Sequence, residues 1–169
     1  MSRMIRDLLD MTRMQSHLAL DFDWHGLDEL AANAILRTEA SFDQAVMLKV
    51  EGADVVAWVD GLLIEQVLVN LLENAAKHAG RCAQVSISIT AEATRFLIEV
   101  ADDGPGLAPG SEAKVFDRFY KSGPDGFGLG LAICRAAAEA HGGTIAARNR
   151  DRGAAFLLEL PRGKEPTLA

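Results

Sequence analysis

Several features that mark other classes of protein are scarce or missing in this 169-residue sequence. Its 17 Lys and Arg are outnumbered by 24 Asp and Glu, and the net charge of -7 argues against a nucleic-acid partner. Only Cys82 and Cys134 occur, in neither CxxC nor CxH spacing, so we expect two buried, inert thiols in a reducing cytoplasm and no metal or disulfide framework. No uncharged apolar run approaches the roughly 18 residues that span a bilayer, and the first residues do not resemble a secretory signal. These absences predict a soluble, cytoplasmic piece of protein.

The residues that are present suffice for one well-packed domain with a short appendage, since 49% of them are hydrophobic. The appendage is a helix over about residues 1–18, with apolar residues on a heptad seam that only Gln15 interrupts. The seam is too short to decide between a pairing helix and a lone amphipathic one.

The remaining pattern alternates short strands with helices. Periodicity predicts strands over 18–24, 46–50, 55–59, 85–90, 95–101, 144–148 and 154–160, and helices over 27–40, 60–79 and 129–141. Residues 102–128 are expected to be loop, with one short helical piece over 112–118. Strands grouped as hairpins between separate helices favour a mixed sheet with helices on one face, an α/β two-layer sandwich.

Four polar residues share one face of the predicted helix 60–79. Asn70, Asn74, Lys77 and His78 recur at helical spacing, although Asn is a poor residue for a helix interior. Amide oxygens suit Mg²⁺, and a Lys one turn further along can reach a phosphate. Taken alone, this face predicts either a magnesium and phosphate site or an ordinary solvated surface.

A second candidate site follows the predicted strand 95–101. Asp102 there can accept the exocyclic amine of adenine, whereas guanine would present a carbonyl. Gly104 and Gly106 permit the close backbone approach that a flat ring packed on a turn requires. Taken alone, so short a string is more often an ordinary Pro-Gly turn.

A third candidate site is the glycine-rich string 126–131, which opens the predicted helix 129–141. Free backbone N–H groups and the helix dipole make such a helix start a phosphate site once glycine removes the side chains. The GxGxG spacing after a loop differs from the Rossmann fingerprint, and no GxxxxGK[ST] element occurs anywhere.

Taken in order, these strings resemble the N, G1, F and G2 boxes of the histidine-kinase ATPase domain, the Bergerat fold shared with gyrase, Hsp90 and mismatch-repair ATPases. The matching strings are residues 70–77, 102–106, 115–119 and 126–131, and the likeness covers about residues 20–161. Gyrase-like members resemble one another in placing Glu at position 70 as general base for water, whereas kinases usually carry Asn, which cannot take a proton. More narrowly, residues 1–13, 70–77 and 128–136 are similar to Kdp-type potassium-responsive sensor kinases.

The resemblance implies a domain organisation and a role for each site residue. Residues 1–19 would end the second dimerisation helix, 20–163 would form the ATP-binding domain, and 164–169 would be a tail. Asn74, helped by Asn70, would bind Mg²⁺, Lys77 would meet a phosphate, and Asp102 would read adenine in a turn formed by Gly104 and Gly106. The residues expected to line the phosphates are Gly126, Gly128, Leu129, Gly130 and Leu131.

Three further residues keep two interpretations each. Arg118 and Lys121 either touch ATP or the acceptor helix, or belong to a solvated loop. His78 stands where the family often has an aromatic ring over the adenine, and it either stacks there or is a surface histidine. The lid, residues 107–125, is short for the family, which leaves its closing contacts open.

The phosphoacceptor of this family is a histidine followed by Glu or Asp. The chain has four histidines, His17, His25, His78 and His141, which precede Leu, Gly, Ala and Gly in that order. None fits the pattern, so the acceptor is expected outside this chain. The resemblance therefore implies a kinase domain that works with its own dimerisation helices and a response regulator, in a membrane-bound homodimer. Two rival functions are a docking module that has lost turnover and a self-contained ATPase of the gyrase type.

Overall fold

The computed structural model describes residues 5, 8–9, 20–120 and 129–163. Its elements, in chain order, are β1 (Phe22–Gly26), α2 (Leu27–Thr38), the 3₁₀ turn η1 (Glu39–Ser41), β2 (Met47–Glu51), β3 (Val56–Asp60), α3 (Gly61–Ala79), β4 (Val85–Ala91), β5 (Arg95–Asp102), the 3₁₀ turn η2 (Lys114–Phe116), α4 (Gly130–Ala140), β6 (Thr144–Asn149) and β7 (Ala154–Pro161). Among the described residues, no helix is both long and apolar enough to cross a bilayer.

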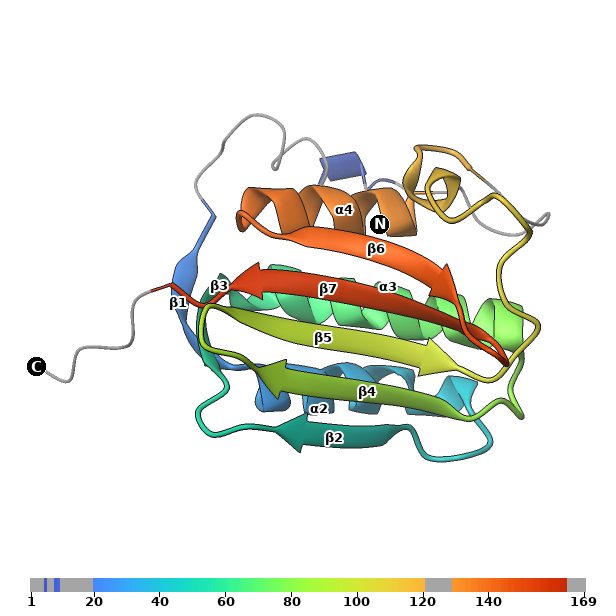
Figure 1. Cartoon of the computed structure of the whole chain (residues 1–169), viewed down its shortest axis with the longest axis horizontal. Helices are drawn as coiled ribbons and strands as arrows, with labels where there is room; N and C mark the ends of the chain where they lie inside the picture. Colours follow the sequence, from blue (N-terminus) through green and yellow to red (C-terminus); the bar gives the residue numbers. More distant parts are fainter. Residues whose placement is uncertain (1–4, 6–7, 10–19, 121–128, 164–169) are drawn as a thin grey trace, which may run out of the picture.

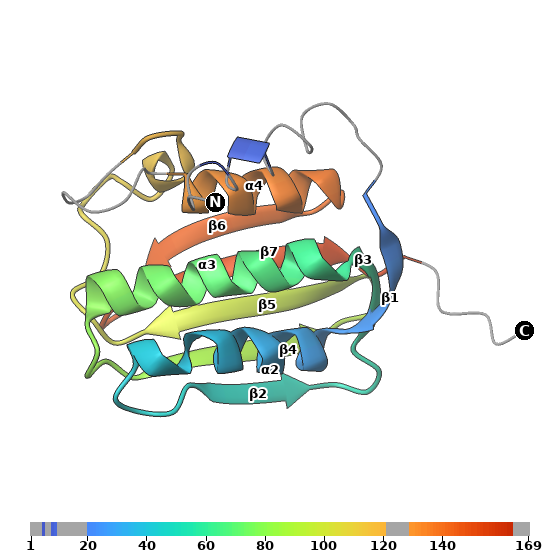
Figure 2. The same cartoon turned by 180° about the vertical axis from the view of Figure 1, so that it is seen from behind.

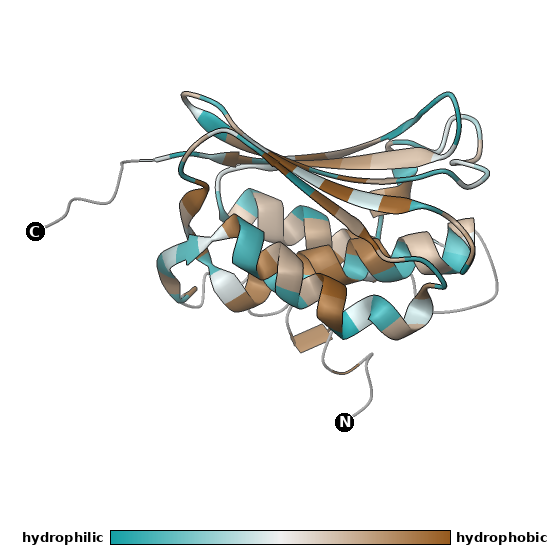
Figure 3. Ribbon diagram, turned by 90° about the horizontal axis from the view of Figure 1, so that it is seen from below, coloured by the Kyte–Doolittle hydropathy of each residue, from teal (hydrophilic) through white to brown (hydrophobic). Residues whose placement is uncertain are grey.

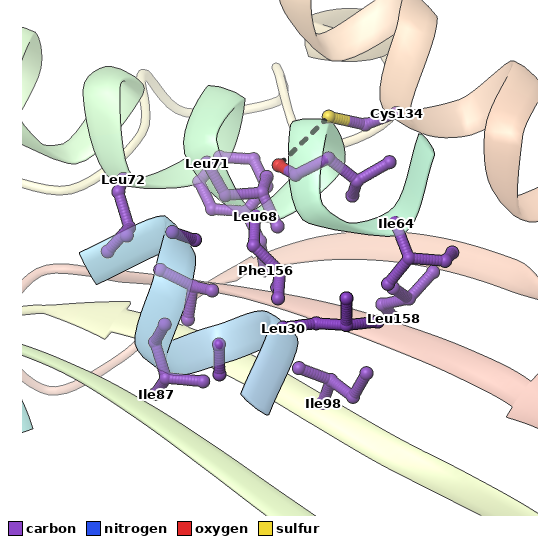
Figure 4. Close-up of a cluster of buried hydrophobic side chains, with 14 of the residues drawn as sticks. Leu30, Ile64, Leu68, Leu71, Leu72, Ile87, Ile98, Cys134, Phe156 and Leu158 are labelled. Carbon is purple, nitrogen blue, oxygen red and sulfur yellow. Dashed lines mark hydrogen bonds between the residues drawn. The ribbon is translucent and has the colours of Figure 1, made fainter. Parts of the chain in front are cut away.

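The main sheet has five strands in the order β2-β4-β5-β7-β6. β2 runs parallel to β4, and the other neighbouring strands are antiparallel, so the sheet is mixed. Helices α2, α3 and α4 cover one face of it, as the edge-on view shows (Figure 3). Alternate residues of the central strands point into the interface between the two layers, among them Ile87, Ile98 and Leu158 (Figure 4). The predicted α/β two-layer sandwich is confirmed.

Helix α3 is the central element of the helical layer, between α2 and α4 (Figure 2). Asp60 caps its start by accepting a hydrogen bond from Leu63 N at 3.1 Å, and Gly80 ends it with φ +93°. Its buried face includes Leu68 and Leu71, each worth about 1.5–3 kcal/mol when fully buried. This packing fixes the rotation of α3 and, with it, the direction of its polar face.

Strands β1 and β3 form a separate antiparallel pair, apart from the main sheet and at one end of the molecule (Figure 1). The sequence predicted the first strand over 18–24, but the strand is Phe22–Gly26, because it pairs residue by residue with Val56–Asp60. The alternation of apolar and polar residues within the strand does not determine this pairing with β3. Trp24 packs against Trp58 across the pair, with ring centroids 5.1 Å apart.

Two other expectations fail in detail. Cys82 is exposed in the turn after α3 rather than buried, while Cys134 is buried and donates to Val67 O at 3.7 Å (Figure 4). The thiol of Cys82 donates to Asp43, and this hydrogen bond is the main cause that raises its pKa. The helical piece expected over 112–118 is only the 3₁₀ turn Lys114–Phe116.

His141 joins the end of α4 to the start of α3 as a neutral imidazole. Its Nδ1 lies 2.7 Å from the carbonyl of Ala137, which can only accept, so Nδ1 carries the proton. Nε2 therefore accepts from the backbone N–H of Asp60 at 3.0 Å. Burial lowers the pKa of His141, and the Ala137 carbonyl and the Asp60 charge oppose this effect.

We expect the free energy of unfolding to fall on acidification. Because the fold lowers the pKa of His141, the unfolded chain binds more protons, and stability drops as the pH falls below about 6.5, the ordinary histidine value. The drop levels off below the folded-state pKa. His141→Leu should cost about 1–3 kcal/mol at pH 7 and flatten the slope between pH 7 and 5, as measured by urea unfolding.

The control for this prediction is His78→Gln, which removes a second described histidine whose pKa the fold lowers. It should leave the His141 part of the slope in place. Equal slopes for the wild type and His141→Leu would contradict the assignment.

Candidate functional site

The polar face of α3 runs from a buried centre to an exposed end. Asn70 is 6% exposed, Asn74 is half-buried, and Lys77 and His78 are exposed. The Oδ1 atom of Asn70 accepts from Gln66 Nε2 at 2.9 Å, and its Nδ2 donates to Gly130 O at 3.3 Å. Asn70 is thus a buried, hydrogen-bonded residue where α3 meets α4, and it is not part of an ordinary solvated surface.

The turn after β5 packs on the end of α3. Asp102 is 7% exposed, and its Oδ1 accepts from Gly104 N at 2.9 Å and from Ala154 N at 3.3 Å. A Cβ on Gly104 would lie 2.5 Å from the Cβ of Ala79, so only glycine allows this close approach. Asp102 is therefore held beside the exposed end of the polar face, with Oδ2 as its second acceptor atom.

The turn between β6 and β7 supports Asp102 from the other side. A Cβ on Gly153, where φ is +87°, would lie 2.0 Å from the carbonyl oxygen of Asp102. Arg150 Nη1 donates to the same carbonyl at 3.4 Å, and Arg152 Nε donates to Asp103 O at 3.2 Å. These three residues were not predicted from the sequence, because a charged turn with a glycine has no local feature that places it against a distant loop.

Asn149, at the end of β6, fixes the first residue of the lid. Its Oδ1 accepts from Leu107 N at 2.6 Å and its Nδ2 donates to Leu107 O at 3.1 Å. Gly106 allows this pairing, since it has φ +83° and a Cβ there would lie 2.7 Å from Asn149 Oδ1. Asn149 was not predicted from the sequence either.

The start of α4 reaches the same region. Leu129 is buried and Leu131 is half-buried. Gly130 lies next to Asn70, since a Cβ on it would be in ordinary contact with Asn70 Cγ at 3.9 Å. Figure 1 shows the end of α3, the end of β5 and the β6–β7 turn at one end of the molecule. Three other predicted residues, Lys121, Gly126 and Gly128, lie outside the described residues.

The charge of Asp102 acts on His78 across the site. Partial burial is the main cause that lowers the pKa of His78, Lys77 lowers it further, and the charge of Asp102 raises it. A neutral imidazole near pH 7 is the form that stacks on a base without a charge to desolvate. Stacking by His78 stays a prediction.

The predicted F box combines buried and exposed residues. Phe116 packs edge-on against Phe156, with ring centroids 6.1 Å apart, and anchors the segment to the sheet. Arg118 is exposed, as is Phe119, whose φ of +63° is rare for an aromatic residue. The structure places Arg118 on the surface, and its contact with ATP or an acceptor helix stays a prediction.

The donor set of the site fits a hard cation that takes most of its ligands from elsewhere. Among the described residues, no group of three or more His, Cys, Asp or Glu is placed to hold a metal. Asn70 and Asn74 instead offer amide oxygens one helical turn apart, and Asn70 is buried and oriented. Mg²⁺ commonly keeps waters and substrate phosphates as ligands, so two amide oxygens would suffice as its protein ligands.

The fold and the site together define a nucleotide-binding domain in which a polar helix face, an acidic turn and a glycine helix start converge. The family model described as "Histidine kinase-, DNA gyrase B-, and HSP90-like ATPase" matches residues 59–164. The chain belongs to this family, on the branch of the sensor histidine kinases. It carries the ATP-binding catalytic domain of such a kinase.

Three relatives illustrate the match. Sensor protein KdpD of Escherichia coli (strain K12) is 41% identical over 99% of this chain, and the chain spans 19% of that relative's length. Full-length ShkA in complex with AMPPNP superposes with a TM-score of 0.83 at 25% identity, over 96% of this chain and 36% of that one. Histidine kinase ThkA in complex with the response regulator protein TrrA gives 0.72 at 25% identity, over 94% and 48%.

Proposed function

We propose that this domain binds Mg·ATP and transfers the γ-phosphoryl group to a histidine on dimerisation helices outside this chain. The observation that carries the proposal is the junction of α3 with α4, where Asn70 joins the metal-binding face to the glycine start of α4. At the other end of the same face, Gly104 packs the Asp102 turn on Ala79. One helix thus links the proposed phosphate and adenine positions.

We assign each residue the role that the family resemblance implies, and this arrangement supports those assignments among the described residues. Asp102 Oδ2 accepts the adenine amine, while Gly104 and Gly106 let the turn lie flat against the base. Asn74 and Asn70 hold Mg²⁺, which neutralises phosphate charge when bound, and Lys77 contacts a phosphate. The remaining assigned residues complete the nucleotide site: His78 on the base, Arg118 and Lys121 beside the F box in contact with ATP or the acceptor helix, and Gly126, Gly128, Leu129, Gly130 and Leu131 along the phosphates.

The chain supplies position and charge, and the attacking nitrogen comes from the acceptor helix. Position 70 supports a kinase over a self-contained ATPase, because the Asn70 amide cannot take a proton from water. Its Nδ2 donates to a carbonyl, which is a structural use of the residue.

The partners are proposed from the relatives. ThkA is seen with its response regulator TrrA, and we infer that a response regulator receives the phosphoryl group here. The likeness to KdpD supports a role in potassium sensing within a membrane-anchored homodimer whose cytoplasmic part includes this chain.

Phosphate transfer in trans tests the proposal. The chain is mixed with γ-labelled Mg·ATP, with and without a fragment that carries the dimerisation helices of the same protein. We expect label on the fragment and little release of phosphate without it. Asn74→Ala should slow the transfer at least about 10–100-fold, the range that loss of an outer-shell partner of a metal ligand already costs.

Asn33→Ala, on the exposed face of α2, is the matched control and should transfer at the wild-type rate. Phosphate release without the helices would support a self-contained ATPase instead. Absence of nucleotide binding would leave a docking module.

A further inference from the structure

A chain of side-chain hydrogen bonds crosses the helical layer and ends at Asn70. Arg37 Nη2, in the last turn of α2, donates to Gln66 Oε1 at 3.4 Å. Gln66 Nε2 donates to Asn70 Oδ1 at 2.9 Å, and Asn70 Nδ2 donates to Gly130 O at 3.3 Å. These hydrogen bonds therefore link α2, α3 and α4 through the side-chain amides of Gln66 and Asn70.

The two end groups fix which atom of each amide donates and which accepts. A guanidinium has only donors, so Gln66 must turn its oxygen toward Arg37 and its NH₂ group toward Asn70. A carbonyl only accepts, so Asn70 must turn its NH₂ group toward Gly130. An amide whose oxygen and nitrogen could exchange freely thus has one orientation here.

We propose that Gln66 is a positioning residue that keeps the oxygen of the Asn70 amide available to the cation. A flipped Asn70 would present its NH₂ group, whose partial positive charge repels a metal ion. One lone pair of Oδ1 is used by Gln66, and the other remains for Mg²⁺ or one of its waters. This inference rests on the proposed metal site at Asn70 and Asn74 and adds the residue that orients it.

The test measures how much Mg²⁺ strengthens the binding of a non-hydrolysable ATP analogue, by calorimetry in magnesium and in EDTA. Gln66→Met keeps the volume and removes the donor. We expect the strengthening by Mg²⁺ to fall about 10-fold, the lower end of the range for groups that orient a metal ligand, while binding in EDTA is unchanged.

A double-mutant cycle separates orientation from packing. In Asn70→Asp both distal atoms are oxygens, so orientation no longer matters. Gln66→Met should then have no further effect on the strengthening by Mg²⁺. An equal loss in the wild-type and Asn70→Asp backgrounds would show that Gln66 only packs, and would overturn the proposal.

Gln44→Met is the matched control. Gln44 Oε1 accepts an amide–amide hydrogen bond from Gln84 of the same 2.9 Å length, and its loss should change nothing at the site. Asn74→Ala distinguishes a failure of the proposed metal site from a failure of the proposed role of Gln66. If it abolishes the strengthening by Mg²⁺ while Gln66→Met has no effect, the metal site stands and the role of Gln66 falls. If Asn74→Ala also has no effect, the metal site itself is wrong and the role of Gln66 falls with it.

Discussion

Asp102→Asn should lower the affinity for ATP about 100-fold and remove most of the preference for ATP over GTP. Asp102 Oδ1 accepts two backbone N–H groups, and Oδ2 is proposed to accept the adenine amine. An asparagine that keeps its oxygen on these two N–H groups must turn its NH₂ group toward the adenine amine, and a buried donor left unpaired costs about 1–3 kcal/mol. The same NH₂ group can donate to the carbonyl of guanine, so GTP loses less affinity than ATP does.

Asp103→Asn is the control for this prediction, because it changes the adjacent carboxylate. Asp103 Oδ1 accepts from Gln84 N at 2.8 Å, a bond that ties this carboxylate to the start of β4. Its amide oxygen can keep this bond, so base preference should stay as in the wild type. Calorimetry with both nucleotides measures the two variants, and an undiminished preference for ATP in Asp102→Asn would remove the adenine assignment.

The fold was predictable where local chemistry sets the element. Helix α3 was expected over 60–79 and spans Gly61–Ala79, because Asp60 is a capping residue and Gly80 adopts a positive φ that ends the helix. The hairpin of β4 and β5 followed from alternation in the same way. The separate pairing of β1 with β3 did not, since the choice of partner strand depends on tertiary packing and not on the pattern within the strand.

The residues of the candidate site likewise divide into those that local sequence predicts and those that only distant contacts reveal. Asn70, Asn74 and Asp102 were found because each is unusual in its own element or belongs to an ordered set of motifs. Gly153 and Asn149 were missed, because their importance comes from contacts with residues more than 40 positions away. Gln66 is an ordinary helix residue by sequence, and only the neighbours contributed by α2 and α4 give it a direction.

Gly153→Ala should have the largest effect on the folded domain. Its Cβ would lie 2.0 Å from the carbonyl oxygen of Asp102 and 2.8 Å from Asp103 Cα, and these are backbone atoms that no side-chain rotation can move away. A left-handed conformation costs an L-residue about 1–2 kcal/mol, and overpacking adds about 1–3 kcal/mol. We expect the free energy of unfolding to fall by about 2–5 kcal/mol in urea titrations, and ATP affinity to fall at least about 100-fold.

Gly163→Ala separates the two causes, since Gly163 also has a positive φ, +67°, but nothing lies within 4 Å of its added Cβ. This variant should show only the conformational cost and bind ATP normally. If Gly153→Ala matched it in both stability and affinity, the β6–β7 turn would not be what holds Asp102. If only Gly153→Ala loses nucleotide affinity, the cause is geometric. The added Cβ must displace the backbone carbonyl of Asp102, and the carboxylate proposed to accept the base belongs to the same residue. The backbone of Asp102 therefore cannot move without also moving its carboxylate.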